Sequence, residues 1–186
     1  MTKVFWKLLK ESQIPLTLAA AFGVLSGALL EMRLESLISL PILLAIVPPL
    51  NDMAGDLGTI IVARLTTAFY LGSVEPKLRR NKGLRMNLLS LMLVSTIVVF
   101  YISFILSPVY SLTLNTGEML LTVFAIVVLA GMMGVFFTLL SGIFLSVLSF
   151  KKGYNPDTVV MPIITLIGDF LSIVSILFVA KVFGLV

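Results

Sequence analysis

Several residue types are absent or scarce in this chain of 186 residues. It has no cysteine, which excludes disulfides, thiolate metal sites and a cysteine nucleophile. It also has no histidine, which removes the commonest transition-metal ligand and the usual proton switch. Charged residues make up only 12% of the chain and hydrophobic residues 59%. A water-soluble globule of this size needs more polar sequence, so the composition predicts an integral membrane protein.

Apolar segments long enough to cross a bilayer, which takes about 20 residues, recur along the chain. We predict an all-α, polytopic membrane protein with five transmembrane helices, at about 13–30, 37–72, 86–107, 118–150 and 158–185. The second is expected to be long and broken, because it carries prolines and polar residues at its centre. The first has a second interpretation as a cleavable secretory signal. No water-soluble segment is visible, so we expect one transmembrane domain over 1–186 without a cytosolic sensor domain.

The lysines and arginines predict the orientation, because loops rich in them stay cytoplasmic. Ten of the thirteen would lie on one side, at Lys3, Lys7, Lys10, Lys77, Arg79, Arg80, Lys82, Arg85, Lys151 and Lys152. This favours a multi-pass plasma-membrane protein with its N-terminus in the cytoplasm and its C-terminus outside. The net charge of +4 then reflects topology, and no nucleic-acid partner is expected.

The stretch PPLNDMAGD, residues 48–56, places polar groups in the middle of the second predicted span. Proline removes a backbone donor and frees carbonyls of the preceding turn, which suits a cation. If the following residues are helical, Asp52 and Asp56 lie on one face, about 6 Å apart along the axis. Asn51 adds a neutral oxygen beside them.

A similar pattern recurs in the last span, where Pro162 precedes Gly168 and Asp169 by the spacing that separates Pro49 from Gly55 and Asp56. The two spans are predicted to run in opposite directions, and inverted repeats of interrupted spans point to a midplane binding site. Chance similarity of a short pattern is the alternative. A carboxylate at that depth costs about 2.5–3.5 kcal/mol, so these acids should face a pore or be protonated and hydrogen-bonded to a neighbouring helix.

These residues make up the predicted site. The metal ligands are expected to be Asp52, Asp56 and Asp169, with pore-lining or supporting roles for Asn51, Gly55, Thr165, Gly168 and Arg64. The glycines would allow close approach of another helix or a hydrated ion. The hydroxyl of Thr165 could face the ion's water shell or bond its own helix. Mg²⁺ takes oxygen ligands and keeps several waters, which fits such a site, although Mn²⁺, Ca²⁺, Na⁺ or protons would use similar groups.

The stretches PPLNDMAGDLGTIIVARLTTAFYLG (48–72) and YNPDTVVMPIITLIGDFLSIVSILFVA (154–180) resemble the two signature regions of the membrane domain of MgtE-type magnesium transporters, especially the branch with the eukaryotic solute-carrier members. The resemblance implies a homodimer, or a fused pseudo-dimer, whose ion path follows the two-fold axis, lined by spans two and five, with Asp169 at the central magnesium site. It also implies an asparagine where this chain has Asp56, and an arginine at the position of Arg64. The latter has a plainer interpretation as a residue that binds carbonyls or extends to the membrane surface.

The predicted function is therefore a channel or transporter for divalent cations, most simply Mg²⁺ as the transported ion, in a homodimer within the lipid bilayer. A proton- or sodium-coupled divalent cation exchanger is the alternative, since the extra carboxylate at Asp56 changes the charge of the path. An enzyme is not expected. Intramembrane aspartyl proteases also use two membrane aspartates, but they need a tyrosine before one of them, and neither Asp56 nor Asp169 follows tyrosine. A membrane subunit without transport activity would have no use for these acids.

Overall fold

A computed structural model describes residues 2–32, 41–79, 81–114 and 120–185. These residues form an all-helical structure, as predicted, with five helices: α1 (Thr2–Met32), α3 (Pro41–Tyr70), α4 (Lys82–Leu114), α5 (Leu120–Lys151) and α6 (Pro156–Val182). Parts of two predicted spans, 37–40 and 118–119, lie outside the described residues. The first helix is longer than the predicted span, because the polar N-terminal segment continues into it without interruption.

Four of the helices contain stretches long and apolar enough to cross a membrane: Pro15–Met32, Lys82–Pro108, Leu120–Lys151 and Pro156–Val182. Within the described residues α3 does not meet this criterion. It has the length, with 30 residues, but Asn51, Asp52 and Asp56 lower the hydropathy of its centre. The helix that a membrane would accommodate least easily is therefore the one that carries Asp52 and Asp56, two of the three predicted metal ligands.

The prediction that the second span is broken is wrong, because α3 is one continuous helix through Pro48 and Pro49. Two adjacent prolines remove hydrogen bonds to only two carbonyls, both in the preceding turn. One turn is therefore weakened, and the helix stays continuous. Buried residues on both sides of this turn, including Ile46 and Leu50, keep the helix packed against its neighbours. Transmembrane helices tolerate proline in this way when neighbouring helices support them.

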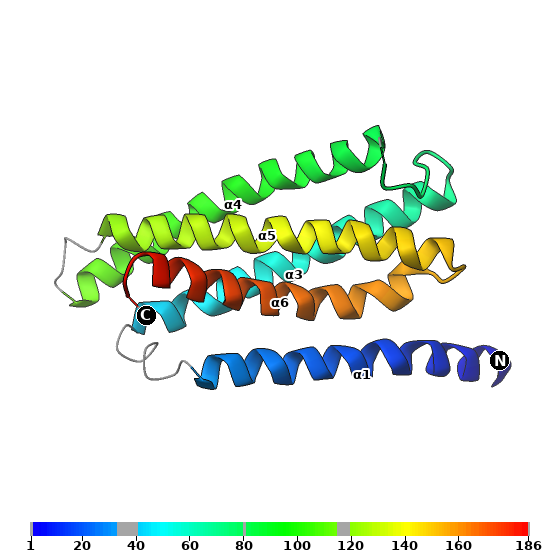
Figure 1. Cartoon of the computed structure of the whole chain (residues 1–186), viewed down its shortest axis with the longest axis horizontal. Helices are drawn as coiled ribbons and strands as arrows, with labels where there is room; N and C mark the ends of the chain where they lie inside the picture. Colours follow the sequence, from blue (N-terminus) through cyan, green and yellow to red (C-terminus); the bar gives the residue numbers. More distant parts are fainter. Residues whose placement is uncertain (1, 33–40, 80, 115–119, 186) are drawn as a thin grey trace.

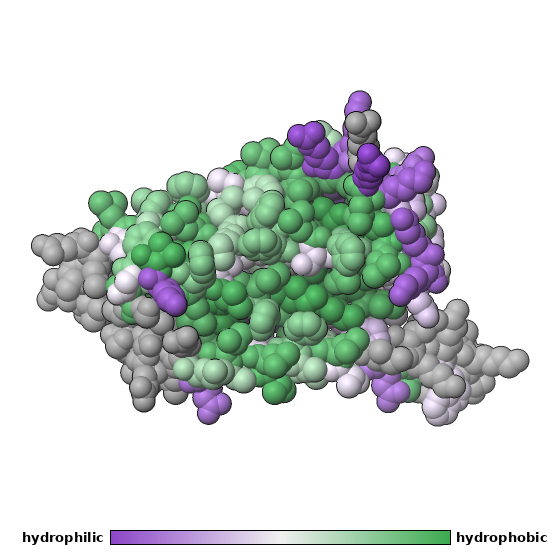
Figure 2. Space-filling model, viewed as in Figure 1, coloured by the Kyte–Doolittle hydropathy of each residue, from purple (hydrophilic) through white to green (hydrophobic). Residues whose placement is uncertain are grey.

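The helices run alternately in opposite directions, so their connections gather at two ends of the bundle (Figure 1). The N-terminus, the α3–α4 connection and the α5–α6 connection lie at one end, and the C-terminus lies at the other (Figure 1). These are the segments that the lysine and arginine pattern placed on one side of the membrane. Figure 2 shows hydrophilic residues at the end with the α3–α4 and α5–α6 connections, beside a broad hydrophobic surface along the helices. Their grouping at one end is confirmed.

The helix α5 packs against α3, α4 and α6 through small side chains. Gly131, Gly134, Thr138, Gly142 and Ser146 are all buried in it. A Cβ on Gly142 would lie 2.8 Å from Cγ2 of Ile61, and one on Gly134 would lie 3.2 Å from Cα of Ser172. These small residues let the neighbouring helices approach α5 closely. The consequence is that α5 fixes α3 and α6 beside each other.

The helix α1 lies at the edge of the bundle and packs against α6 (Figure 1). Its contacts include the ring of Phe22 against that of Phe170, with 6.4 Å between centroids. Only 17% of its apolar stretch Pro15–Met32 is buried. Most of this stretch therefore offers an apolar surface to its surroundings, as expected of a helix in lipid.

Candidate cation site at a helix crossing

The helices α3 and α6 touch backbone to backbone at two glycines. A Cβ on Gly168 would lie 3.0 Å from the backbone nitrogen of Gly55 and 3.1 Å from the carbonyl carbon of Ala54. A Cβ on Gly55 would lie 3.2 Å from Cγ2 of Thr165. Both glycines are buried. No larger residue fits at position 168 without moving a backbone, so the glycines set the distance between the two helices.

Each contacting glycine is followed directly by an aspartate, Asp56 on α3 and Asp169 on α6. The two helices run in opposite directions (Figure 1). The glycines of the two Gly-Asp pairs that the sequence aligned therefore lie at one crossing of antiparallel helices, which is the arrangement expected of an inverted repeat.

Three carboxylates, those of Asp52, Asp56 and Asp169, belong to the residues beside this crossing, and we call them the acidic flank. Asp52 lies one turn before Asp56 on α3, and both are exposed in the single chain, whereas Asp169 is partly buried. The carboxylate of Asp52 is close enough to that of Asp169 for their charges to interact. None of the three has a salt-bridge partner in the described part of the chain. The flank is thus a strip of uncompensated negative charge beside the crossing.

One chain does not complete a metal site on its own. In the described residues no group of three or more acids comes close enough together to hold an ion directly. The charge of Asp52 acts on Asp169 across the crossing, and Asp56 lies one turn after Asp52 on α3, but Asp52 and Asp56 are both exposed in the single chain. Such an arrangement suits an ion that keeps part of its water shell or that receives further ligands from another chain.

Two of the predicted supporting residues, Thr165 and Asn51, differ in whether their side-chain oxygen takes part in a hydrogen bond. The hydroxyl of Thr165 donates to the backbone oxygen of Met161, 3.2 Å away, so it bonds its own helix, and its methyl group packs on Gly55. The side-chain oxygen of Asn51 is buried and has no hydrogen-bond donor among the described residues. Asn51 directly precedes Asp52 in α3, so the prediction that this oxygen supports a bound ion stays a prediction.

Arg64 is directed away from the acids. Its guanidinium Nη1 donates to the hydroxyl oxygen of Ser90 on α4, 3.4 Å away. The Ser90 hydroxyl in turn donates to the backbone oxygen of Asn87. The partner differs from the carbonyl or membrane surface expected from the sequence, and no sequence signal pointed to a serine 26 residues away. In the single chain, Arg64 ties α3 to α4 and leaves the carboxylates unpaired.

Sequence reasoning also missed Ser172, whose hydroxyl donates to the backbone oxygen of Leu50 across a buried contact of 3.1 Å. This bond joins α6 to α3 one turn from the glycine contact. The signal for it was the position of Ser172 four residues after Gly168, on the same helix face, as a polar residue in an apolar span. Together with the glycines it holds the crossing in register.

Comparison with known families gives one match. Residues 47–179 match the model of the MgtE family, which is described as a divalent cation transporter. The matched range includes α4 and α5 and all three carboxylates of the flank. No individual curated protein matches the chain significantly.

Proposed function

Because the chain belongs to the MgtE family of divalent cation transporters, we propose that it carries Mg²⁺ across the membrane along the flank of the α3–α6 crossing. The observation that supports this proposal is the contact between Gly55 and Gly168, because each glycine directly precedes an aspartate on one of two opposite-running helices. The ion ligands in this proposal are Asp169, Asp56 and Asp52, with Asn51 as a supporting oxygen.

The chemistry of the flank favours Mg²⁺. Its ligands are oxygens, and a hard divalent cation prefers oxygen over nitrogen or sulfur. Mg²⁺ is commonly bound through one or two carboxylates while it keeps several of its waters. The open flank of carboxylates around the crossing matches this habit. Mn²⁺ would be accepted in the same place, since it takes the same ligands.

The exposure of Asp52 and Asp56 supports a homodimer. Charged groups at mid-membrane depth cost about 2.5–3.5 kcal/mol each when they face lipid, so these acids need water or another chain beside them. The exposed face of α3 continues on both sides of the acids, at Ala45 and Ile60. A second copy on this face would enclose six carboxylates around one axis. Their mutual repulsion would be relieved by a divalent ion.

The same proposal includes five membrane crossings with the N-terminus in the cytoplasm of a plasma-membrane protein. The end of the bundle with the N-terminus also carries the α3–α4 and α5–α6 connections (Figure 1). These connections hold Lys77, Arg79, Lys82 and the pair at 151–152, which the positive-inside rule assigns to the cytoplasm. In this arrangement α3 crosses the bilayer as a pore helix, and α5, α6 and a second copy of the chain separate it from lipid.

The experiment is Mg²⁺ uptake by liposomes that contain the purified protein, followed with an enclosed Mg²⁺-sensitive dye. We expect Asp169→Ala and Asp56→Ala to lose most of the uptake, while Glu75→Gln, which removes an exposed acid outside the helices, retains it. Size-exclusion chromatography checks that each variant remains folded. Full uptake in both alanine variants would contradict the proposed site.

A proton- or sodium-coupled exchanger remains the second candidate, and the extra carboxylate of Asp56 favours it. A coupled exchanger would respond to an imposed proton or sodium gradient, whereas a channel would respond to the Mg²⁺ gradient and the membrane potential alone. Asp56→Asn tests whether this acid carries the coupling. If it does, the variant keeps Mg²⁺ uptake and loses its response to the proton gradient.

A further inference from the structure

The connection between α3 and α4 holds an unusual share of the protein's charge. Residues 73–85 contain five cations, Lys77, Arg79, Arg80, Lys82 and Arg85, and one acid, Glu75. This segment therefore has a net charge of +4, equal to the net charge of the whole chain. Since the rest of the chain sums to zero, the excess positive charge is confined to one short segment at one end of the bundle.

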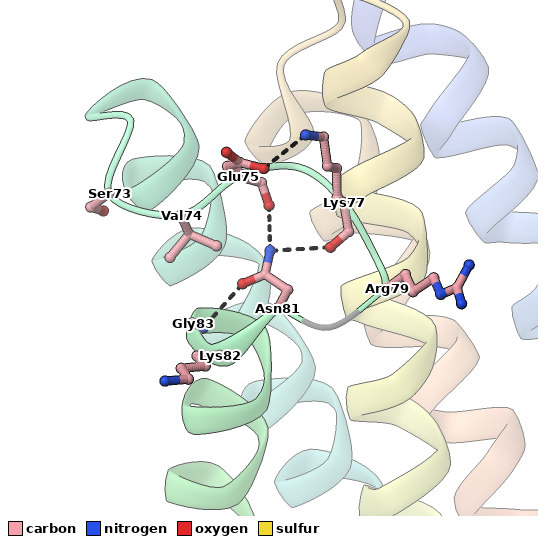
Figure 3. Close-up of a pocket in the computed structure, with 8 residues that line it drawn as sticks. All are labelled: Ser73, Val74, Glu75, Lys77, Arg79, Asn81, Lys82 and Gly83. Atoms are coloured by element: carbon pink, nitrogen blue, oxygen red, sulfur yellow. Dashed lines mark hydrogen bonds and ion pairs between the residues drawn. The ribbon is translucent and has the colours of Figure 1, made fainter.

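Asn81 gives this connection a defined shape. Its side-chain oxygen accepts hydrogen bonds from the backbone nitrogens of Gly83 and Leu84, at 3.0 and 3.3 Å, and so caps the start of α4. Its side-chain nitrogen donates to the backbone oxygens of Glu75 and Lys77 (Figure 3). One side chain thus joins both halves of the connection.

The positive side chains of this connection are available at the surface. Lys77 forms an ion pair with Glu75 at 2.9 Å. In the described part of the chain, Arg79 and Lys82 have no carboxylate partner, and both are exposed. They border a cavity of about 300 Å³ beside the first turn of α4, but Figure 3 shows them extending to opposite sides of the connection. Cations that diverge in this way match an extended anionic surface better than one enclosed phosphate.

Apolar side chains flank these cations. Leu78 within the connection and Met86 and Leu89 on the first turns of α4 are 51%, 67% and 50% exposed. The stretch Lys82–Pro108 that follows is apolar enough to cross a membrane. A phospholipid has charged and apolar parts in the same arrangement, with a charged phosphate at the membrane surface and apolar chains beneath it. A soluble anion would gain nothing from the apolar part.

We propose that residues 73–79 and 81–85 form a docking surface for anionic phospholipids, with the headgroup phosphates on Arg79 and Lys82 and the acyl chains along the exposed face of α4. Clusters of cations next to a transmembrane helix are attracted to anionic lipid, by an amount that corresponds to about fivefold in affinity for each cation. The surface is separate from the acidic flank of α3 and α6, so its test does not depend on transport.

The test is native mass spectrometry of the full chain in detergent, titrated with phosphatidylglycerol or with phosphatidylcholine. We expect the parent protein to bind phosphatidylglycerol preferentially, and Arg79→Gln with Lys82→Gln to weaken that binding about 25-fold, from about fivefold for each cation. The control is Lys151→Gln with Lys152→Gln, which removes two exposed cations from the same end of the bundle and should leave binding within about twofold. If the double variant is not recovered folded, the single variant Lys82→Gln replaces it, and we expect its affinity for phosphatidylglycerol to fall about fivefold.

Three results would overturn the proposal. Equal weakening by the two double variants would show general attraction to the whole end of the bundle. Unchanged binding in the Arg79 and Lys82 variants would show that the surface is elsewhere. Displacement of the lipid by glycerol 1-phosphate at the same concentration would show that the partner is a soluble phosphate, because this compound has the headgroup chemistry without the chains.

Discussion

The contact between the two glycines predicts a specific cost for adding one methyl group. In Gly168→Ala the new Cβ would lie 3.0 Å from the backbone nitrogen of Gly55 and 3.2 Å from its Cα. Carbon atoms in ordinary contact lie about 3.5–4.0 Å apart, so α3 and α6 would have to separate by about 0.5–1 Å. Backbone atoms cannot rotate away as a side chain can. Such overpacking costs about 1–3 kcal/mol.

A matched control is available at Gly27 in α1, where an added Cβ would meet nothing within 4 Å. Alanine is favoured over glycine in a helix at both positions, and this gain cancels when the two variants are compared. We expect Gly168→Ala to be less stable than Gly27→Ala by about 1–3 kcal/mol. The assay is unfolding by SDS titration, followed by circular dichroism.

The same displacement should impair transport, because it moves Asp169 relative to Asp52. A loss of about 1.4 kcal/mol in ion binding would raise the half-saturating Mg²⁺ concentration about tenfold. The liposome assay measures this directly. Equal stability and equal uptake in Gly168→Ala and Gly27→Ala would refute the backbone contact that defines the site.

Two further predictions follow from neighbouring contacts. Gly55→Ala should impair uptake less than Gly168→Ala, because its Cβ would meet a side-chain methyl group, that of Thr165, at 3.2 Å. Adding Thr165→Ser to Gly55→Ala removes that methyl group and should restore uptake. A double variant with no recovery of uptake would contradict this contact. The chain has no cysteine, so an introduced cysteine can form a disulfide only between two copies. Ile60→Cys on the exposed face of α3 should form a disulfide-linked dimer in the membrane, whereas Ile97→Cys on α4, which is also exposed, should remain a monomer. The reverse pattern would place the dimer interface on α4.

Composition and charge patterning were sufficient to predict much of the fold. Within the described residues, helices cover the five predicted spans except at 71–72 and 183–185, because the apolar lengths leave few other solutions in a bilayer. The connections rich in lysine and arginine lie at one end, as predicted. The continuity of α3 could not be predicted from PPLNDMAGD alone. Local chemistry there favours a break, but packing against α5 and α6, which are distant in sequence, keeps the helix continuous.

The sequence suggested the residues of the candidate site but not the contacts between them. The alignment of the two Gly-Asp pairs identified Asp56 and Asp169, and the structure explains it through the glycine contact. Which helix faces each glycine depends on the register of α3 against α6, and a single sequence does not contain that register. The hydrogen bonds of Ser172 to Leu50 and of Arg64 to Ser90 were missed for the same reason.

The most direct test of the central claim is an anomalous-scattering map from crystals soaked in Mn²⁺, which takes the same oxygen ligands as Mg²⁺. We predict a peak on the flank of the α3–α6 crossing, between Asp52, Asp56 and Asp169 and on a two-fold axis that relates two copies of the chain. Peaks confined to the ends of the bundle, with none beside the Gly55–Gly168 contact, would contradict the proposed ion site.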